Sequence, residues 1–499
     1  MRQLAWPIWL AVSLSLVAGA LMRLAFSPVG WWPLAVVLPA FMLWLLAGRG
    51  PRQVLLLGWL FGFATFAVGT PWIYISIHEF GHVWAPAAAV LMLLFSAVVG
   101  LFPALALWLA SRLAAGQATG FLLLAPFSWV LLEWVKSWFL SGFPWLSLGY
   151  SQTDTPLMTL APLGGVFLIS LVVMLLAAAL AMLCIDPGKR CWAWRRPLAA
   201  IVLSAVMVAM AQWLIRPAEP QGEWSIAIAQ GNFGQDIKFD RDWLMPQIDY
   251  YRQTTLANAD VDLVLWPETV LPPFYDRLKE PLFNPLGEQL SERGGALVAG
   301  AFHRSEDGQQ VYNAVVTAGL AEGIYLKRKL VPLGEFFPFK PLLRLLPGLD
   351  IPLSDMSPGP HEQTLLRVHG QPVGVSICYE DAFGALLLHD VPQARLLINV
   401  SNDAWFGRRA PWQHLQMARM RAAEVQRAMA RSTTTGVSAL IGPRGELLSV
   451  AEPFEQVVLR GQLPLLDGHT PYMIWADWPV VVLCLLPLGF AGWRWRSGR

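Results

Sequence analysis

Eight long runs of apolar residues constrain this chain more than any other feature of its sequence. Each run approaches or exceeds the roughly 20 residues that a helix needs to cross about 30 Å of hydrocarbon. The runs cover residues 6–25, 31–48, 53–75, 84–111, 119–140, 158–185, 197–215 and 473–493. The sequence therefore predicts a multi-pass α-helical membrane domain of about eight transmembrane helices and excludes a wholly water-soluble protein.

Acidic residues divide the chain into a membrane part and a water-facing part. Hydrophobic residues make up 55% of the 499 residues and charged residues 14%, whereas roughly 25% of an ordinary soluble domain is charged. Four of the 34 Asp and Glu residues precede Arg216, and the other 30 follow it. We therefore predict an N-terminal membrane domain of about seven helices at 1–215, a water-facing domain at 216–472, and a final transmembrane helix with a basic tail at 473–499.

Basic residues predict how the chain crosses the membrane. Loops on one side hold most of the basic residues of the membrane part, and loops on the other side hold only Arg23 and Lys136. By the positive-inside rule, both termini face the cytoplasm and residues 216–472 face outward. The water-facing part is itself mildly acidic, so the sequence predicts no nucleic-acid partner.

A cleaved signal peptide is an alternative interpretation of the first apolar run. Arg2 precedes the run, and the small residues at 17–20 fit a cleavage site. The run continues to Leu24 without a polar cleavage region, which favours an uncleaved first helix. The later topology is the same in both cases.

The water-facing part has the pattern of an α/β domain. Short β-rich runs alternate with helical patterns, and several runs are apolar throughout, which is typical of strands buried on both faces. Amphipathic helices are predicted at Arg241–Ala257 and Trp412–Arg431. Strands are predicted at 225–232, 262–268, 296–302, 311–318, 372–380, 396–403, 437–443 and 457–463.

Polar residues of three chemical kinds stand at the ends of predicted strands. Glu268 closes one apolar run, Lys327 follows a short apolar segment, and Cys378 closes another run. Each signal alone is weak, because a lone Cys at a strand end is more often a small buried side chain. Together they supply a nucleophile, a base and a cation. A carboxylate can take the proton of a thiol, and an ammonium can stabilise the oxyanion that forms in acyl transfer.

Four segments resemble the nitrilase, or carbon–nitrogen hydrolase, superfamily with its Glu-Lys-Cys triad. They are LVLWPET (263–269), YLKRKLVPLGEF (325–336), ICYED (377–381) and NDAWFG (402–407). Joined to a multi-helix membrane part, they resemble the family of bacterial apolipoprotein N-acyltransferases more closely. The resemblance implies a nitrilase-like α-β-β-α sandwich, with Cys378 as nucleophile, Glu268 as general base and Lys327 as oxyanion-stabilising cation. It also marks further supporting or substrate-binding residues, namely Glu335, Tyr379, Glu380 and Trp405.

The same resemblance implies a ping-pong acyl transfer in a bacterial inner membrane. A phospholipid acyl donor would acylate Cys378, and the resulting thioester would pass the acyl chain to the α-amine of S-diacylglyceryl-cysteine on a diacylated apolipoprotein. No cofactor and no metal are implied. The catalytic domain would face the periplasm, next to the lipid bilayer that holds both substrates.

Two alternatives from other functional classes remain open. A membrane-tethered amidase or nitrilase would keep the triad and release its thioester to water. An intramembrane metalloprotease is the other, because the segment His78-Glu79-Phe80-Gly81-His82 matches H-E-x-x-H, which on one helix would present two imidazoles to Zn²⁺. Gly81 weakens a helix at this point, and no third ligand stands in a recognisable motif.

The segment at 336–353 is predicted to be a mobile arm that dips into the bilayer beside the active site. It begins directly after Glu335, has seven large apolar residues between 336 and 346, and contains four prolines. Prolines disfavour a regular helix, and the segment is too short to cross a bilayer. Lys340 and Arg344 could reach lipid phosphates from an interfacial position.

Overall fold

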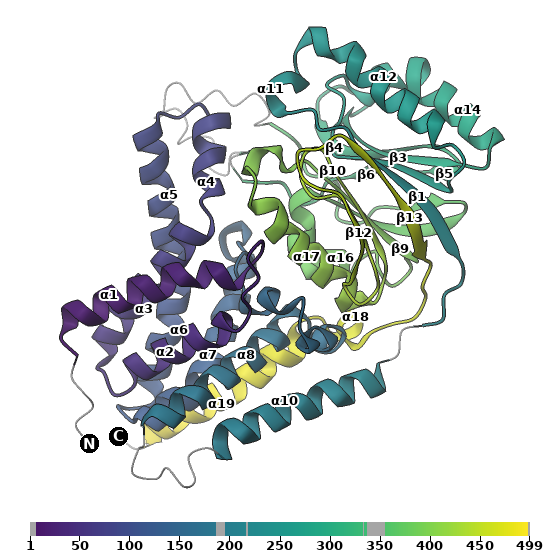
Figure 1. Cartoon of the computed structure of the whole chain (residues 1–499). Helices are drawn as coiled ribbons and strands as arrows, with labels where there is room; N and C mark the ends of the chain where they lie inside the picture. The colour runs from purple at the N-terminus through teal and green to yellow at the C-terminus, as the bar shows by residue number, and fades with distance from the viewer. Residues whose placement is uncertain (1–5, 186–194, 216–217, 333, 337–354, 498–499) are drawn as a thin grey trace. The chain divides into compact units, whose positions relative to one another are not determined.

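The computed structural model describes residues 6–185, 195–215, 218–332, 334–336 and 355–497. Within these ranges the chain forms two compact units (Figure 1). The first, here called the helical unit, comprises 1–78, 82–216 and 475–499. The second, here called the sandwich unit, comprises 79–81 and 217–474.

The helical unit consists of apolar helices. In the described ranges, six helical stretches are long and apolar enough to span a bilayer by length and composition, and two shorter apolar helices, α2 and α10, accompany them. The elements are α1 (Ile8–Leu21), η1 (Met22–Ala25), α2 (Leu34–Leu46), α3 (Pro51–Gly69), α4 (Trp72–Ile75), η2 (Ser76–Phe80), α5 (Ala85–Val99), α6 (Leu101–Leu113), α7 (Ala118–Trp138), α8 (Ala161–Ile185), α10 (Arg195–Leu214) and α19 (Trp478–Ser497). The predicted multi-pass membrane domain of about eight helices is confirmed.

The apolar run at 84–111 forms two helices that meet at Gly100. A Cβ on Gly100 would lie 2.6 Å from the amide nitrogen of Phe63 in α3, and a Cβ on Gly62 would lie 2.6 Å from the carbonyl oxygen of Gly100. The junction of α5 and α6 therefore packs directly on the backbone of α3. Close helix approach of this kind requires small residues and is common in membranes.

Lys136 lies within helix α7 and is buried, so its predicted position in a loop is wrong. Its Nζ donates to the carbonyl oxygen of Trp145 (2.6 Å). One turn earlier, Glu133 accepts hydrogen bonds from Trp129 Nε1 and from the N–H of Leu148, both at 3.0 Å. Charges inside a membrane are costly and face the protein interior. Without Lys136, the loops predicted to face outward hold even fewer basic residues than the sequence alone indicated.

The sandwich unit contains two sheets packed face to face between helices (Figure 1). The order is β13-β1-β2-β3-β4-β6 in the first sheet and β12-β11-β10-β9-β8-β7-β5 in the second. The strands are β1 (Glu223–Gln230), β2 (Leu263–Trp266), β3 (Ala296–Arg304), β4 (Val311–Gly319), β5 (Ala321–Glu322), β6 (Tyr325–Leu326), β7 (Leu366–Val368), β8 (Gln371–Ile377), β9 (Leu396–Ser401), β10 (Met429–Thr433), β11 (Ala439–Ile441), β12 (Leu447–Val450) and β13 (Val457–Pro464).

Helices cover the outer face of each sheet. α12 (Arg241–Ala257) and α14 (Asn284–Glu292) pack on the first sheet, and α17 (Ala410–Val425) packs on the second. The other short helices of this unit are α11 (Gln235–Lys238), α13 (Tyr275–Leu278), η7 (Lys279–Phe283), η8 (Cys378–Ala382), α16 (Gly384–Leu387), η9 (Asp403–Phe406) and α18 (Pro471–Trp475). The predicted α-β-β-α sandwich is confirmed.

Strand periodicity explains why both faces of each sheet are buried. Ile226 and Ile228 of β1 point into the core between the sheets, whereas Ala227 and Ala229 point towards the helices on the outer face. Because successive side chains of a strand alternate between faces, a strand covered on both sides must be apolar throughout. The apolar runs of the sequence have this origin.

Two predicted elements have the wrong boundaries. The helix predicted at Trp412–Arg431 ends at Val425, because Gln426 adopts a left-handed conformation (φ 49°). The strand β10 then begins at Met429 and lies between β9 and β11. Arg431, the last residue of that predicted helix, is instead fully buried in this strand. The strand predicted at 372–380 ends at Ile377, where the chain turns into η8.

Candidate active site

Glu268, Lys327 and Cys378 converge in the sandwich unit from different strands. Glu268 follows β2 of the first sheet, Cys378 follows β8 of the second, and Lys327 directly follows β6. Each of β2 and β8 has parallel neighbours, and functional groups collect at the carboxyl ends of such strands. Lys327 Nζ lies 3.3 Å from Glu268 Oε1, and both groups act electrostatically on the thiol of Cys378.

Lys327 joins two carboxylates at the centre of the site. Its Nζ donates to Glu335 Oε1 (2.8 Å) as well as to Glu268 Oε1. The Lys327 side chain is 1% exposed, and those of Glu268 and Glu335 are 7% and 13% exposed. Burial by itself lowers the pKa of Lys327, but the two carboxylates outweigh burial and raise that pKa above its ordinary value. Lys327 therefore stays positively charged.

Cys378 occupies a strained backbone position at the end of β8. Its φ of 51° lies in the left-handed region, which side chains other than glycine rarely adopt. Burial raises the pKa of the Cys378 thiol well above its usual range, and the negative charge of Glu268 raises it further, while Lys327 opposes both effects. The resting thiol is therefore protonated, and a nucleophilic attack requires a base that removes its proton.

Glu380 supports the site without facing the thiol directly. Its Oε1 accepts hydrogen bonds from the N–H groups of Arg328 (2.7 Å) and Lys329 (3.0 Å), directly after Lys327. Its Oε2 accepts one from the N–H of Ile377 (2.8 Å), directly before Cys378, and one from the hydroxyl of Tyr325 (2.9 Å). One buried carboxylate thus holds the backbone beside both Lys327 and Cys378.

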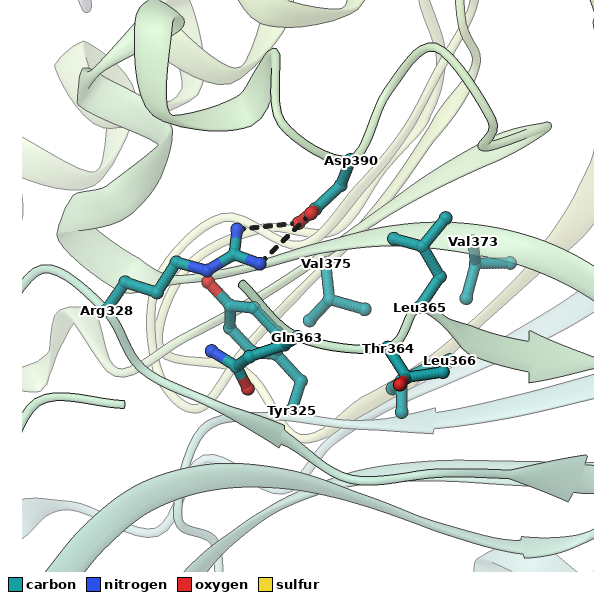
Figure 2. A pocket seen from close by; sticks show the side chains of 9 residues that line it. All are labelled: Tyr325, Arg328, Gln363, Thr364, Leu365, Leu366, Val373, Val375 and Asp390. Carbon is teal, nitrogen blue, oxygen red and sulfur yellow. Dashed lines mark hydrogen bonds and ion pairs between the residues drawn. The ribbon is translucent and has the colours of Figure 1, made fainter. Parts of the chain in front are cut away.

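A second charged pair, Arg328 and Asp390, holds the segment that carries Lys327 in place. Arg328 donates two hydrogen bonds to Asp390, NH1 to Oδ2 (2.8 Å) and NH2 to Oδ1 (3.0 Å). Figure 2 shows this bidentate pair beside the ring of Tyr325, with Gln363 below it. Gln363 holds the backbone of Leu326 through both its amide oxygen and its amide nitrogen. Side-chain contacts therefore hold both chain neighbours of Lys327, Leu326 and Arg328.

Tyr379 and Trp405 lie on the two short 3₁₀ turns of the site. Tyr379 is buried in η8. Its ring lies edge-on to that of Phe383, with 4.8 Å between the ring centroids. Trp405 is half-buried in η9, and the residue before this turn, Asn402, donates its N–H to Glu268 Oε2 (2.7 Å). The structure therefore places both residues on segments that contact the triad.

Asn313 is a site residue that the sequence did not reveal. Its Nδ2 donates to Glu268 Oε1 (2.6 Å) and to Glu335 Oε1 (3.0 Å), so it bridges the two carboxylates. Its main-chain carbonyl oxygen accepts a hydrogen bond from the main-chain N–H of Lys327 (2.9 Å). The sequence offered one indication of this role, namely a single amide residue in the mostly apolar run at 311–318. Such a residue does not indicate which side chains it will contact.

A buried ionic network lies next to the backbone of Cys378. His414 approaches Asp381 through Nε2 (2.6 Å) and Asp403 through Nδ1 (2.9 Å), and Arg431 donates to the other oxygen of each carboxylate (2.9 and 3.0 Å). Nε2 of His414 also lies 3.2 Å from the carbonyl oxygen of Cys378. Two cations and two anions therefore form a neutral, fully buried support for the strained turn.

The charge of His414 makes the stability of the sandwich unit depend on pH. Burial alone lowers the pKa of His414, but Asp381 and Asp403 outweigh it and raise that pKa to about 9. Because folding raises this pKa, the stabilisation that protonated His414 provides is complete below the pKa of the unfolded state, about 6.5. It is lost as the pH rises through about 9. The loss approaches about 3 kcal/mol for a shift of this size. The amount by which the charge of His414 raises the apparent melting temperature in detergent should therefore shrink between pH 7 and pH 10.

The control for this prediction is His414→Gln, which retains polarity but cannot carry the charge. Its melting temperature should lie below that of the wild type at pH 7 and approach the wild-type value as the pH rises to 10. An equal pH dependence in both proteins would contradict the assignment to His414.

The H-E-x-x-H segment does not form the helix that a zinc site would need. The π-helical turn η2 ends at Phe80, and His82 has a left-handed φ of 51°. His78 instead directs Nδ1 at the carbonyl oxygen of Val83 (2.8 Å). In the described ranges, no group of three His, Cys, Asp or Glu side chains is arranged to hold a metal ion.

The predicted arm at 336–353 lies outside the described residues, except for Phe336.

Comparisons with known proteins agree with this architecture. The carbon–nitrogen hydrolase family model matches residues 225–467, so the sandwich unit is a carbon–nitrogen hydrolase domain. A model for the apolipoprotein N-acyltransferase N-terminal domain matches residues 18–179. Apolipoprotein N-acyltransferase from Methylococcus capsulatus is 41% identical over 95% of this chain and 94% of its own length. The chain belongs to the apolipoprotein N-acyltransferase family.

Further relatives show the extent of the similarity. Apolipoprotein N-acyltransferase from Pseudomonas syringae pv. tomato is 39% identical over 98% of each chain. Among solved structures, the carbon–nitrogen hydrolase from Helicobacter pylori G27 covers 52% of this chain and 95% of its own, with 13% identity and a TM-score of 0.37. The similarity to the acyltransferases thus spans both units.

Proposed function

We propose that this membrane protein is an acyltransferase that moves an acyl chain from a phospholipid to the N-terminal amine of an apolipoprotein. The acceptor is the α-amine of S-diacylglyceryl-cysteine, and the intermediate is a thioester on Cys378. The observation that carries the proposal is a buried thiol beside an ammonium that two carboxylates hold in place. The full-length similarity to apolipoprotein N-acyltransferases supports the choice of substrates.

In the first half-reaction, Glu268 takes the proton of the Cys378 thiol. The sulfur attacks the carbonyl carbon of a phospholipid ester, and the resulting oxyanion is stabilised by the ammonium of Lys327. When the carbon–oxygen ester bond breaks, the departing alkoxide takes the proton from Glu268. The products are a lysophospholipid and an acyl thioester.

In the second half-reaction, the α-amine of the acceptor attacks the thioester carbonyl. Glu268 takes a proton from the attacking nitrogen, and Lys327 again stabilises the oxyanion. The carbon–sulfur bond then breaks, the thiolate recovers its proton from Glu268, and an amide remains on the acceptor. Amines attack thioesters readily, and the amide does not easily react in reverse, so transfer runs in one direction.

The membrane helices suit these substrates because both the donor and the acceptor are anchored in a bilayer. We place the protein in the bacterial inner membrane, with the sandwich unit in the periplasm and both termini in the cytoplasm. The distribution of basic residues among the loops supports this orientation. A hydrolase of small soluble amides would not need such an anchor.

A labelled-lipid experiment tests the proposed function. Purified full-length protein in phospholipid nanodiscs receives a phospholipid with a radiolabelled acyl chain and then a synthetic diacylated lipopeptide. We expect label on Cys378 that hydroxylamine releases, followed by stoichiometric movement of that label to the amine of the lipopeptide. A lipopeptide with an acetylated α-amine is the matched control and should leave the label on the protein.

The same experiment separates transfer from hydrolysis. Label that leaves Cys378 as free fatty acid, with or without the lipopeptide, would identify a membrane-tethered hydrolase and contradict the proposed acceptor. Absence of any label on Cys378 would contradict the thioester itself.

A further inference from the structure

The short helix α11 contacts the surroundings of the proposed base from two sides. At its start, Gln235 Oε1 accepts from Asn402 Nδ2 (3.1 Å), and the N–H of Asn402 donates to Glu268 Oε2. At its end, Lys238 Nζ donates to the hydroxyl of Thr269 (2.8 Å), the residue directly after Glu268. This helix carries none of the motifs that mark the triad.

Lys238 is a second buried ammonium in the site. It is 3% exposed, and its Nζ lies 5.5 Å from the centre of the Phe302 ring on β3 and 5.7 Å from that of Phe239. Within the described part of the chain, its side chain makes a single hydrogen bond, to the hydroxyl of Thr269. Burying an ammonium is costly unless an anion compensates it, and Glu268 attracts this one.

Thr269, the partner of Lys238, is strained. Its φ of 43° is left-handed, which is unfavourable for a β-branched residue. The backbone there also packs against Gly300, where a Cβ would lie 2.5 Å from the Cα of Glu268 and 2.7 Å from the nitrogen of Thr269. A strained conformation persists only where its surroundings hold it. The Lys238 bond is one such restraint, one residue from the carboxylate that must face the thiol.

Charge balance gives Lys238 a second role. Lys327 is bonded to both Glu268 and Glu335, so this cluster contains two carboxylates and one ammonium. The positive charge of Lys238 balances the one negative charge that Lys327 leaves uncompensated in this cluster. Without it, the site would hold a net negative charge at the point where attack creates further negative charge on sulfur and oxygen.

We propose that Lys238 is a positioning residue for acylation of Cys378, which holds Thr269 and compensates the negative charge of the Glu268–Lys327–Glu335 cluster. This inference rests on the proposed function, because it assumes that Glu268 activates the thiol. Lys238 acts through Glu268 and Thr269.

The pH dependence of acylation distinguishes this role from a purely structural one. Burial lowers the pKa of Lys238 to about 8, and Glu268 partly opposes that effect. The charge is therefore present below about pH 8 and lost above it. Lys238 faces Glu268, Thr269, Phe302 and Phe239, while Asp236 on its own helix is exposed. Acylation should consequently decline as pH rises through about 8.

The test measures the burst of p-nitrophenol when the full-length protein in nanodiscs reacts with a p-nitrophenyl fatty-acyl ester between pH 6 and pH 10. In the wild type, we expect the burst rate to fall with a midpoint near pH 8. Lys238→Arg should keep its charge over this range, because a guanidinium holds its proton more tightly than an ammonium, so the midpoint should rise by about one unit or more. Lys238→Met should be about tenfold slower at pH 7 and nearly insensitive to pH from 7 to 9.

Lys279→Met is the matched control, because Lys279 is exposed and lies on η7. It should retain the rate and pH profile of the wild type. A midpoint that stays near pH 8 in Lys238→Arg, a wild-type rate in Lys238→Met, or a wild-type profile without the decline would each overturn the inference. A wild type without any burst on Cys378 would instead contradict the proposed function, and this inference with it.

Discussion

The Cys378→Ala protein will form no acyl thioester and will transfer no acyl chain, with a loss of about 10⁴-fold or more. Removal of a covalent nucleophile has effects of this size or larger, because the remaining groups have no covalent intermediate to stabilise. The Cys378→Ser protein should be nearly as slow. A hydroxyl holds its proton more tightly than a thiol, and the buried position of Cys378 already disfavours a negative charge. The measurement is hydroxylamine-labile label from a radiolabelled phospholipid.

Matched controls are available among the other cysteines. Cys184 is exposed at the end of α8, and Cys484 is buried in α19, both in the helical unit. Cys184→Ala and Cys484→Ala should retain the label and the transfer rate. Full transfer by the Cys378→Ala protein would remove the central claim of the proposed mechanism.

The three residues proposed as the triad could be selected from the sequence because each stands where an apolar run ends. A strand that is buried on both faces is apolar, so Glu268 and Cys378 were conspicuous at its exit. The sequence could also separate Lys327 from Lys329, but only through the resemblance to known motifs. The structure adds a physical difference, because Lys327 is bonded to two carboxylates whereas Lys329 Nζ lies over the ring of Phe383 at 4.8 Å.

The supporting roles of Asn313, His414 and Arg431 were not predictable, because the partners of these residues are distant in sequence. Asn313 lies 45 residues from Glu268, and its place in an apolar run is compatible with any satisfied core amide. His414 lies in the middle of a helix, and its neighbours Asp381 and Asp403 come from two other segments. Arg431 was assigned to a helix that does not extend so far. No local pattern determines pairings of this kind, which depend on the register between sheets and helices.

Helix and strand boundaries failed for a related reason. Small and amphipathic residues continue the helical pattern past Val425, but Gln426 turns the chain so that β10 can enter the sheet. The gain from completing the second sheet outweighs the local preference for a longer helix. Membrane helices were easier to predict, since a bilayer requires a long apolar segment whatever the tertiary contacts are.

Replacing Glu268 with Gln should slow thioester formation by about 10³-fold without unfolding the protein. The amide is nearly the same size as the carboxylate, and its single oxygen can keep the hydrogen bonds from Lys327 and Asn313, whereas the one from the N–H of Asn402 to the second oxygen is lost. It cannot take a proton, and removal of a general base typically costs 10²–10⁴-fold. Because burial holds the pKa of the Cys378 thiol high, little thiolate forms without a base. The rate should therefore rise with pH in this variant as hydroxide replaces the carboxylate.

Glu335→Gln is the sharpest comparison, because Glu335 shares with Glu268 the hydrogen bonds from Lys327 and Asn313. The two carboxylates differ in their effect on the thiol, since Glu268 is the one whose charge raises the pKa of Cys378. Glu335 also accepts from the N–H of Val331 (2.8 Å), which ties it to its own loop. Glu335→Gln should therefore cost only about tenfold, through weaker placement of Lys327, and should lack the rise at high pH. If the two variants were equally slow, or Glu335→Gln slower, the base would be Glu335 and the assignment of Glu268 would be wrong.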